Sequence, residues 1–443
     1  WLSNLTVMPI DIINSKMEQA VMIPSDLAPQ VPDYGRIQGQ MAQGEEVGED
    51  ISGYINMGGG LPNEDCFPIK SMSLKLADGS DLEIDEATTR QALQYGRTPG
   101  QYELLKWVMT LLKILHDPPT LRDNIHPGKL EVVITSGAQD GLYKICEALV
   151  EEDDTVFTEE PTYSSFLAAI RPYRCKLIPV EMDANGLIPE KLSMVLSDHL
   201  TQNNGKLKFL YCVPNGGNPL GFRYTEDRKR KIYELARNYN LLIVEDDAYF
   251  FLEIKPYTPS FLSMDVDGRV IRIDTFSKTI SPGLRTAFLS GPKPIVEKVI
   301  MAMQASNSSC AVTSQVILLA ILKRMGHDGY LQHCETLAEL YKRRRDLCIK
   351  AAEKHLNGLA EWHTPSGGMF LWIRIKDTKD AYKIVHEKFK SRRIFMMPGV
   401  CFNTDERVSS AHIRVSYSKV SEEDMDKAFR ALAEELRELT ISK

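Results

Sequence analysis

The chain has 443 residues, of which 43% are hydrophobic and 26% charged, and its formal net charge is −7. This length and hydrophobic content allow a large buried core in two or three domains. The mild acidity argues against nucleic acid or an anionic membrane as a partner, and no apolar run reaches the length of a membrane span.

The eight cysteines are scattered and form no CxxC pair, and the nine histidines do not stand at metal-ligand spacing. This pattern argues against a disulfide framework and a metal site, and favours reduced thiols in a cytoplasmic protein. Because the chain begins at Trp1, the sequence leaves open whether a targeting segment has been removed.

Residues 1–55 lack sustained periodicity, and 28–50 are rich in Pro, Gly, Gln and acidic residues, which is typical of an extended arm. From about residue 100, short apolar runs alternate with helical patterns. The predicted strands are 131–135, 155–157, 176–180, 207–213, 241–245 and 270–274, and the predicted helices are 104–115, 140–150 and 225–239. The alternation predicts an α/β domain with a mostly parallel sheet covered on both faces.

After about residue 310 the pattern changes. A long helical stretch, 313–355, precedes a helix near 378–391, a strand at 411–417 and a final helix at 421–438. We therefore expect an N-terminal arm (1–55), a large domain (56–310) and a smaller α+β domain (311–443) that packs with the N-terminal segment.

Polar clusters stand where four of the predicted strands end. They are 136–139, 214–221, Asp246-Asp247 and 275–278. Because ligands of parallel sheets bind beyond the carboxyl ends of the strands, these clusters predict one shared site.

The segment Thr275-Phe276-Ser277-Lys278-Thr279-Ile280-Ser281-Pro282-Gly283-Leu284-Arg285 resembles the cofactor-lysine segment of the class I/II aminotransferases of fold type I. A lysine can form a Schiff base with an aldehyde, and an arginine can present two N–H groups to a phosphate. The resemblance implies pyridoxal 5′-phosphate held by Lys278, with Thr275, Ser277 and Arg285 at its phosphate. It also implies a seven-stranded, mostly parallel sheet between helices, plus a smaller α+β domain.

The segment Glu245-Asp246-Asp247-Ala248-Tyr249 is similar to the family pattern D-x-A-Y. The resemblance implies that Asp246 pairs with the pyridine nitrogen and keeps it protonated, so that the ring can accept electrons. Tyr249 would hydrogen-bond the ring oxygen. Because side chains alternate along a strand, Asp247 would point to the opposite face from Asp246. Two adjacent acids at the end of a strand, taken alone, would also suit a metal site or a helix cap.

Three further positions complete the predicted cofactor contacts. The loop 214–221 resembles the family's P-x-x-x-N-P-x-G, which places Asn218 at the ring oxygen and beside the substrate carboxylate. The segment Ser136-Gly137-Ala138-Gln139 is a strand-to-helix junction, which suits a phosphate. Ala138 stands where the family usually has Ser, so that only its backbone N–H can contact the phosphate. The side chain of Gln139 is the one we retain as a contact at this junction. Tyr163 matches the aromatic residue that stacks on the pyridine.

Arg414 lies in the apolar strand 411–417, where an arginine is costly without an anion. It resembles the family arginine that binds the substrate α-carboxylate through two hydrogen bonds. A surface salt bridge is the alternative reading of this residue.

Residues 56–62 and 93–100 resemble the kynurenine, α-aminoadipate and aromatic aminotransferases, and 142–147 and 178–183 look most like the fungal aromatic enzymes. The resemblance implies that Gly59 and Gly60 lie close to the substrate. It also implies that Tyr95 reaches the cofactor phosphate of a neighbouring subunit, and hence a homodimer with shared sites.

The implied reaction is ping-pong transfer of the amino group between an aromatic L-amino acid and 2-oxoglutarate, with Lys278 moving the substrate proton. Kynurenine or α-aminoadipate is the alternative substrate. A β-lyase or decarboxylase would share the cofactor residues, although an arginine that holds the carboxylate disfavours its loss. Residues 1–55 are too short and too acidic for the DNA-binding module of a regulatory sensor. How one pocket accepts apolar and acidic side chains is not evident from the sequence.

Overall fold

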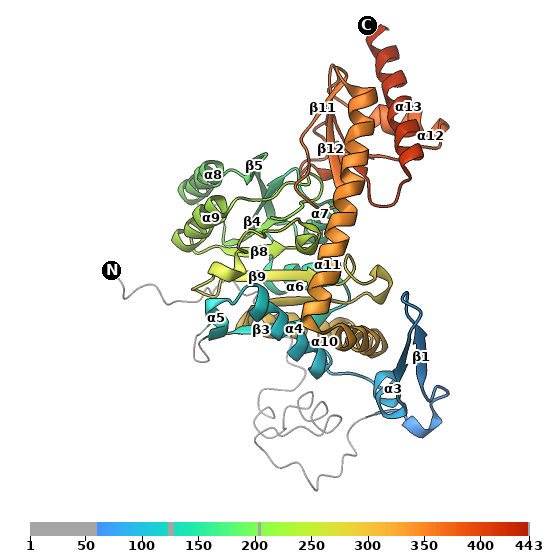
Figure 1. Ribbon diagram of the computed structural model, residues 1–443. Helices are drawn as coiled ribbons and strands as arrows, with labels where there is room; N and C mark the ends of the chain where they lie inside the picture. Colours follow the sequence, from blue (N-terminus) through green and yellow to red (C-terminus); the bar gives the residue numbers. More distant parts are fainter. Residues whose placement is uncertain (1–59, 123–127, 203–204, 442–443) are drawn as a thin grey trace. The chain divides into compact units, whose positions relative to one another are not determined.

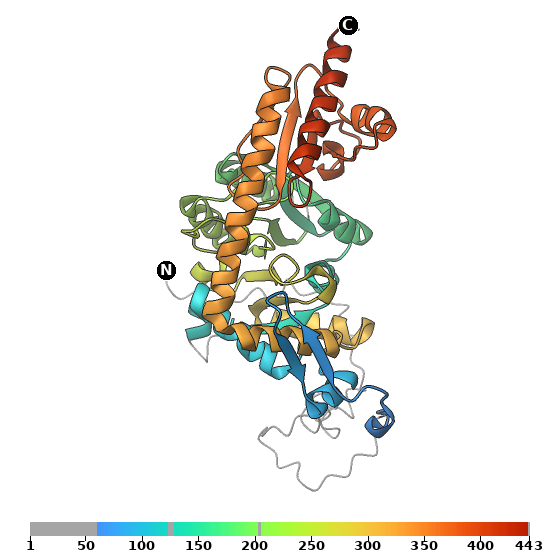
Figure 2. The same ribbon diagram turned by 45° about the vertical axis from the view of Figure 1, so that its right-hand side comes forward.

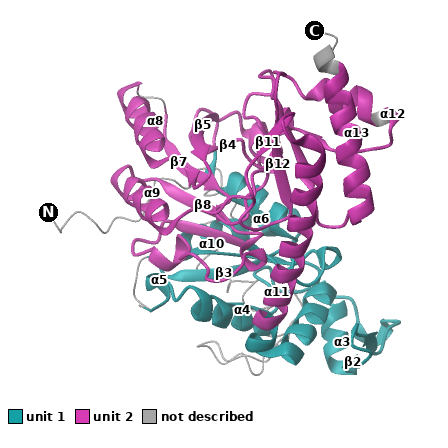
Figure 3. Cartoon of the chain, turned by 45° about the horizontal axis from the view of Figure 1, so that its top comes forward, with its two compact units in different colours: residues 1–150, 274–330 teal, residues 151–273, 331–443 magenta. Residues whose placement is uncertain are grey.

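The computed structural model describes residues 60–122, 128–202 and 205–441, so the predicted arm (1–55) and Gly59 lie outside the described residues. The chain divides into two compact units, shown in Figure 3: 1–150 with 274–330 (unit 1), and 151–273 with 331–443 (unit 2). The domain boundaries predicted at residues 55 and 310 divide the chain at other positions than these two units do. They stay a prediction. Within the described residues, every helix is too short or too polar to cross a membrane.

Unit 1 is built on two antiparallel strands, β3 (Leu130–Thr135) and β10 (Ala287–Pro292), in the register Thr135↔Ala287. Against them pack the helices α4 (Tyr102–Leu115), α6 (Ala138–Leu149) and α10 (Lys293–Ser306). A hairpin of β1 (Met72–Lys75) and β2 (Asp81–Ile84) lies beside α3 (Glu86–Leu93), as Figures 1 and 2 show. The short α5 (Pro119–Arg122) completes the unit. The helices predicted at 104–115 and 140–150 are confirmed.

The first sheet of unit 2 has six strands in the order β9-β8-β7-β4-β5-β6. Their bounds are β4 (Thr155–Glu160), β5 (Lys176–Asp183), β6 (Gly186–Leu187), β7 (Leu207–Cys212), β8 (Leu242–Asp246) and β9 (Val270–Thr275), the last of which ends in unit 1. All pair in parallel except β6. Because β8 and β9 are buried along their whole length, they need cover on both faces.

The helices of unit 2 are α7 (Ser164–Ile170), α8 (Pro189–Gln202) and α9 (Glu226–Asn238), and α8 and α9 lie side by side in Figure 1. The predicted mostly parallel α/β architecture is confirmed. Unit 2 holds six strands of the predicted large sheet and unit 1 holds the antiparallel pair of β3 and β10, while the predicted number of seven stays a prediction. Strand β6 has only two residues.

The C-terminal part of unit 2 holds a four-stranded antiparallel sheet in the order β11-β12-β14-β13. Its strands are β11 (Ala360–Trp362), β12 (Phe370–Ile375), β13 (Met397–Pro398) and β14 (His412–Ser416). The ends of α11 (Val312–Leu356) and α13 (Glu422–Ile441) cover it through a shared apolar core that includes Leu356, Ile373, Ile413 and Phe429 (Figure 2). The predicted long helix is interrupted by non-helical Gly326. The helix expected near 378–391 is a π-helical turn, Ile384–Lys388, followed by α12 (Phe389–Ser391).

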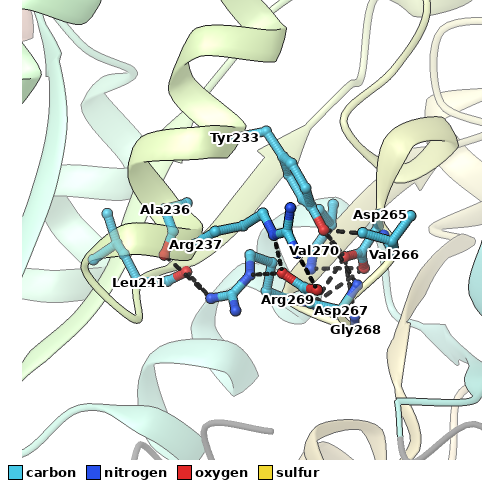
Figure 4. A network of polar contacts seen from close by, with 10 residues as sticks. All are labelled: Tyr233, Ala236, Arg237, Leu241, Asp265, Val266, Asp267, Gly268, Arg269 and Val270. Atoms are coloured by element: carbon cyan, nitrogen blue, oxygen red, sulfur yellow. Dashed lines mark hydrogen bonds and ion pairs between the residues drawn. The ribbon is translucent and has the colours of Figure 1, made fainter. Parts of the chain in front are cut away.

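A network of polar contacts holds the start of β9 against the end of α9 (Figure 4). The buried Asp265 carboxylate accepts hydrogen bonds from three backbone N–H groups, of Gly268, Arg269 and Val270, and from the Tyr233 hydroxyl at 2.9 Å. The Arg269 guanidinium donates to the carbonyls of Ala236 and Leu241. Since these groups lie where β9 begins, they fix the strand at the end opposite to Thr275.

Candidate active site

Lys278 lies in the turn that follows β9 and is partly buried. The preceding hydroxyls are ordered by short contacts, because Thr275 Oγ1 donates to Ser277 Oγ at 3.0 Å and accepts from the Ser277 N–H at 3.1 Å. The turn thus presents the lysine and two hydroxyls from one short segment of unit 1.

Arg285 reaches the junction at the start of α6. Its Nη2 donates to the Ser136 carbonyl at 3.2 Å. A Cβ on Gly137 would lie only 2.1 Å from that nitrogen, and Gly137 has φ +90°, so glycine is required here on both grounds. The structure therefore brings together two segments that the sequence separates by more than a hundred residues.

This junction suits a phosphate. Helix α6 is 12 residues long and begins at Gly137 without a side-chain cap, with Ala138 and Gln139 in its first turn. A helix N-terminus carries partial positive charge and exposes N–H groups, and the Arg285 guanidinium adds a full positive charge. The residues of unit 1 therefore fit the phosphate of the implied cofactor.

In unit 2, the two adjacent acids at the end of β8 have different partners. The Tyr211 hydroxyl donates to Asp246 Oδ2 at 2.7 Å, and the Tyr211 ring stacks on Phe166 at 3.9 Å. Asp247 instead accepts from Asn215 and Arg272. Burial and the neighbouring Asp246 raise the pKa of Tyr211, so it remains a donor. The two acids thus have separate partners, and Asp246 is the acid whose contacts suit a pyridine nitrogen.

The Arg414 side chain on β14 contacts an amide and two aromatic rings. Its Nη1 donates to Asn218 Oδ1 at 2.7 Å, and its guanidinium carbon lies 4.2 Å from the ring centre of Phe370 and 4.8 Å from that of Phe402. Its Nε has no hydrogen-bond partner among the described residues. Burial lowers the pKa of Arg414. A desolvated guanidinium with a free donor fits a carboxylate ligand better than a surface salt bridge.

Tyr249 and Tyr163 belong to the same neighbourhood. Burial raises the pKa of the Tyr249 phenol, while a hydrogen bond donated by the Asn218 side chain and the charge of Arg414 act in the opposite direction. Tyr163 directly precedes α7 and interacts electrostatically with Tyr249, Tyr211 and Arg414. The structure therefore gathers Tyr163, Asn218, Asp246, Tyr249 and Arg414 in unit 2.

The predicted residues near the N-terminus belong to unit 1. Tyr95 has 69% of its surface exposed, and a Cβ on Gly60 would meet nothing within 4 Å. Their assigned contacts with a neighbouring subunit and with substrate stay predictions.

Some residues of this neighbourhood were not predicted from the sequence, namely Tyr211, Phe370, Phe402 and Asn215. The only sequence signal for Phe370 was its place directly after Gly367-Gly368-Met369.

Glu159 supplies a pH-dependent contribution to stability. Burial raises its pKa to about 7 from an ordinary 4.5, although the Tyr224 hydroxyl (2.6 Å) and the Val213 N–H (3.1 Å) donate to Oε1 and oppose that shift. The protonated form is therefore favoured in the fold. This stabilisation is complete below pH 4.5 and is lost as the pH rises towards 7, by about 3 kcal/mol at most.

Glu159→Gln keeps an oxygen for both donors and cannot ionise. We expect its free energy of unfolding in urea, relative to the unchanged protein, to rise between pH 5 and pH 8. A difference between the two proteins that is constant over this range would contradict the shifted pKa.

Residues 62–432 match the family model for aminotransferase class I and II. The chain belongs to this family. The aminotransferase is 41% identical over 390 residues to a mitochondrial kynurenine/α-aminoadipate aminotransferase of Bos taurus, covering 87% of this chain and 92% of the relative. It is 32% identical to an aromatic amino acid aminotransferase of Schizosaccharomyces pombe, covering 72% and 75%.

Among solved structures, a kynurenine aminotransferase of Pyrococcus horikoshii in complex with PMP matches this aminotransferase with a TM-score of 0.73 and 27% identity, over 96% of this chain and 98% of that one. The family identifies pyridoxal phosphate as the cofactor of this aminotransferase.

Proposed function

We propose that this aminotransferase exchanges an amino group between an aromatic L-amino acid and 2-oxoglutarate by a ping-pong mechanism. The observation that carries the proposal is Arg414, a desolvated guanidinium with aromatic rings on two sides and an unused donor. Such a group binds the α-carboxylate common to amino acids and 2-oxo acids, and the adjoining rings favour an apolar side chain.

A second assignment concerns the substrate. The relative at 41% identity is named for kynurenine and α-aminoadipate, whereas the aromatic relative is 32% identical. Kynurenine or α-aminoadipate is therefore the second candidate, with the same chemistry.

The residues are assigned roles as follows. Pyridoxal phosphate, when bound, supplies a ring that accepts the electrons released at the substrate Cα. Lys278 would hold the cofactor and would then carry the proton from Cα as base and acid. Asp246 would keep the ring nitrogen protonated, Tyr163 would stack on the ring, and Asn218 with Tyr249 would contact the ring oxygen.

The phosphate contacts are assigned to Arg285, Thr275, Ser277 and the N–H groups of Ala138 and Gln139. Arg414 binds the substrate carboxylate. Because a bound carboxylate resists departure, this arrangement disfavours a decarboxylase.

Tyr95 and the location are proposed on sequence grounds. We assign Tyr95 to the phosphate of a partner subunit in a homodimer, which its 69% exposure leaves accessible. Sedimentation of the chain as a monomer at catalytic concentration would contradict this.

We also propose a cytoplasmic location, although the Bos taurus relative is named mitochondrial. Cell fractionation decides between the two.

The proposed function is tested by visible absorbance of the purified protein. Phenylalanine alone should convert the lysine-bound cofactor to its amine form, and 2-oxoglutarate should restore the original band. Repeating the titration with kynurenine and α-aminoadipate ranks the substrates. A band that no amino acid changes would refute transamination, and failure to acquire a band after addition of pyridoxal phosphate would refute the role of Lys278.

A further inference from the structure

We infer that Asn215 and Asp247 are positioning residues for the Arg414 carboxylate site, an assignment that rests on the proposed function. Both oxygens of Asp247 accept from Asn215 Nδ2, at 2.9 and 2.8 Å. Arg272 Nη1 donates to Asp247 Oδ2 at 2.6 Å and thereby holds the carboxylate from its other side. The second acid of the pair at the end of β8 thus binds a loop side chain.

The amide of Asn215 fits its surroundings in only one orientation. Its Oδ1 accepts from the Thr258 hydroxyl at 3.3 Å and from Lys229 Nζ at 3.4 Å, while its nitrogen faces the Asp247 carboxylate. Asn215 is 1% exposed. A carboxylate here would face Asp247 directly, and an apolar side chain would leave buried polar groups without partners.

Asn215 lies at the base of the loop that carries Asn218. The Tyr224 N–H donates to the Pro214 carbonyl at 2.9 Å, and Asn215 forms a β-bridge with Arg223. Within the loop, a Cβ on Gly216 would lie 2.7 Å from the backbone nitrogen of Gly368. The loop therefore has little room to shift once its base is held.

At the other end of this loop, Asn218 Oδ1 accepts from Arg414 and its amide nitrogen donates to Tyr249. If the base of the loop at Asn215 shifts, Asn218 therefore shifts with it. Among the described contacts, Asn218 is the side chain that hydrogen-bonds Arg414. Asp247 and Asn215 do not contact the guanidinium themselves, and they act through the loop.

The charges around Asn215 are unusually well buried. Arg272, Glu245, Asp247 and Lys229 are each at most 1% exposed. Buried ion pairs contribute little net stability compared with apolar packing of the same volume. Their directional contacts, however, specify one arrangement of the loop, which is what the carboxylate site requires.

The test is Asn215→Ala, which leaves the Asp247–Arg272 ion pair in place. We expect the KM for the amino acid to rise about tenfold with kcat changed less than about threefold, because misplacement of a substrate-binding group by a fraction of an ångström is sufficient for such an effect. Tyr233→Phe is the control, because it removes a buried hydrogen bond to a carboxylate, Asp265, in the network of Figure 4.

A merely structural role would lower the melting temperature of both variants and leave both KM values unchanged, and that result would overturn the inference. If Asn215→Ala does not fold, the double variant Asn215→Asp with Asp247→Asn exchanges the amide and the carboxylate. It should show a lower KM than Asp247→Asn alone. Equal KM values in those two proteins would also overturn the inference.

Transamination by the unchanged protein distinguishes a failure of the proposed function from a failure of this inference. If it fails to transaminate any amino acid, the proposed function is wrong. If it transaminates and Asn215→Ala retains its KM, only the positioning role is wrong.

Discussion

Lys278→Ala is expected to lower kcat by about 10⁴-fold, because the variant loses the group that carries the substrate proton. It also loses the attachment of the cofactor, so that pyridoxal phosphate binds without a covalent bond. Borohydride reduction followed by peptide mass analysis should add the cofactor mass to the peptide that contains Lys278 in the unchanged protein, and to no peptide of the variant.

The matched control is Lys293→Ala. Lys293 belongs to the same unit, but its side chain is 53% exposed and its ion pair with Glu297 is 3.9 Å long. Kinetics and labelling should match those of the unchanged protein. Cofactor mass on a different lysine peptide would show that the assignment of Lys278 is wrong.

Arg414→Lys is expected to lower kcat/KM for phenylalanine by about 10²- to 10³-fold, the range for breaking a buried, hydrogen-bonded charge pair. Lysine keeps the positive charge but lacks the planar fork that binds two carboxylate oxygens. It also lacks the flat guanidinium that faces Phe370 and Phe402. The measurement is steady-state kinetics with each amino acid and with 2-oxoglutarate.

Phenylethylamine, which lacks the carboxylate, makes this test specific. The preference of the enzyme for phenylalanine over this amine should shrink in Arg414→Lys, because only the carboxylate loses its partner. Arg374→Lys is the control, since Arg374 lies on the neighbouring strand β12 with a side chain 55% exposed. An unchanged preference in Arg414→Lys would assign carboxylate binding to another residue.

Local patterns were sufficient for much of the parallel sheet. The runs at 207–213, 241–245 and 270–274 are mostly apolar, with a few charged residues, and they became β7, β8 and β9 because strands buried on both faces need no alternation. The strand at Ala287–Pro292 was not predicted, because its Ser-Gly-Pro ending resembles a turn. The strand Phe370–Ile375 follows two glycines and was likewise not assigned. Both are paired with strands far away in the sequence, and that pairing decides their conformation.

By itself, the sequence determined the family and predicted the cofactor lysine, because Lys278, Pro282, Gly283 and Arg285 stand within one short segment that resembles the family's cofactor-lysine segment. Only the tertiary structure decided how the two acids at the end of β8 divide their contacts, with Tyr211 bound to Asp246 and Asn215 to Asp247. It also decided what surrounds Arg414, whose partner Asn218 is 196 residues away. Hydrogen bonds and ring contacts between distant segments leave no periodic trace in the sequence, since they arise only when the folded backbone brings those segments together.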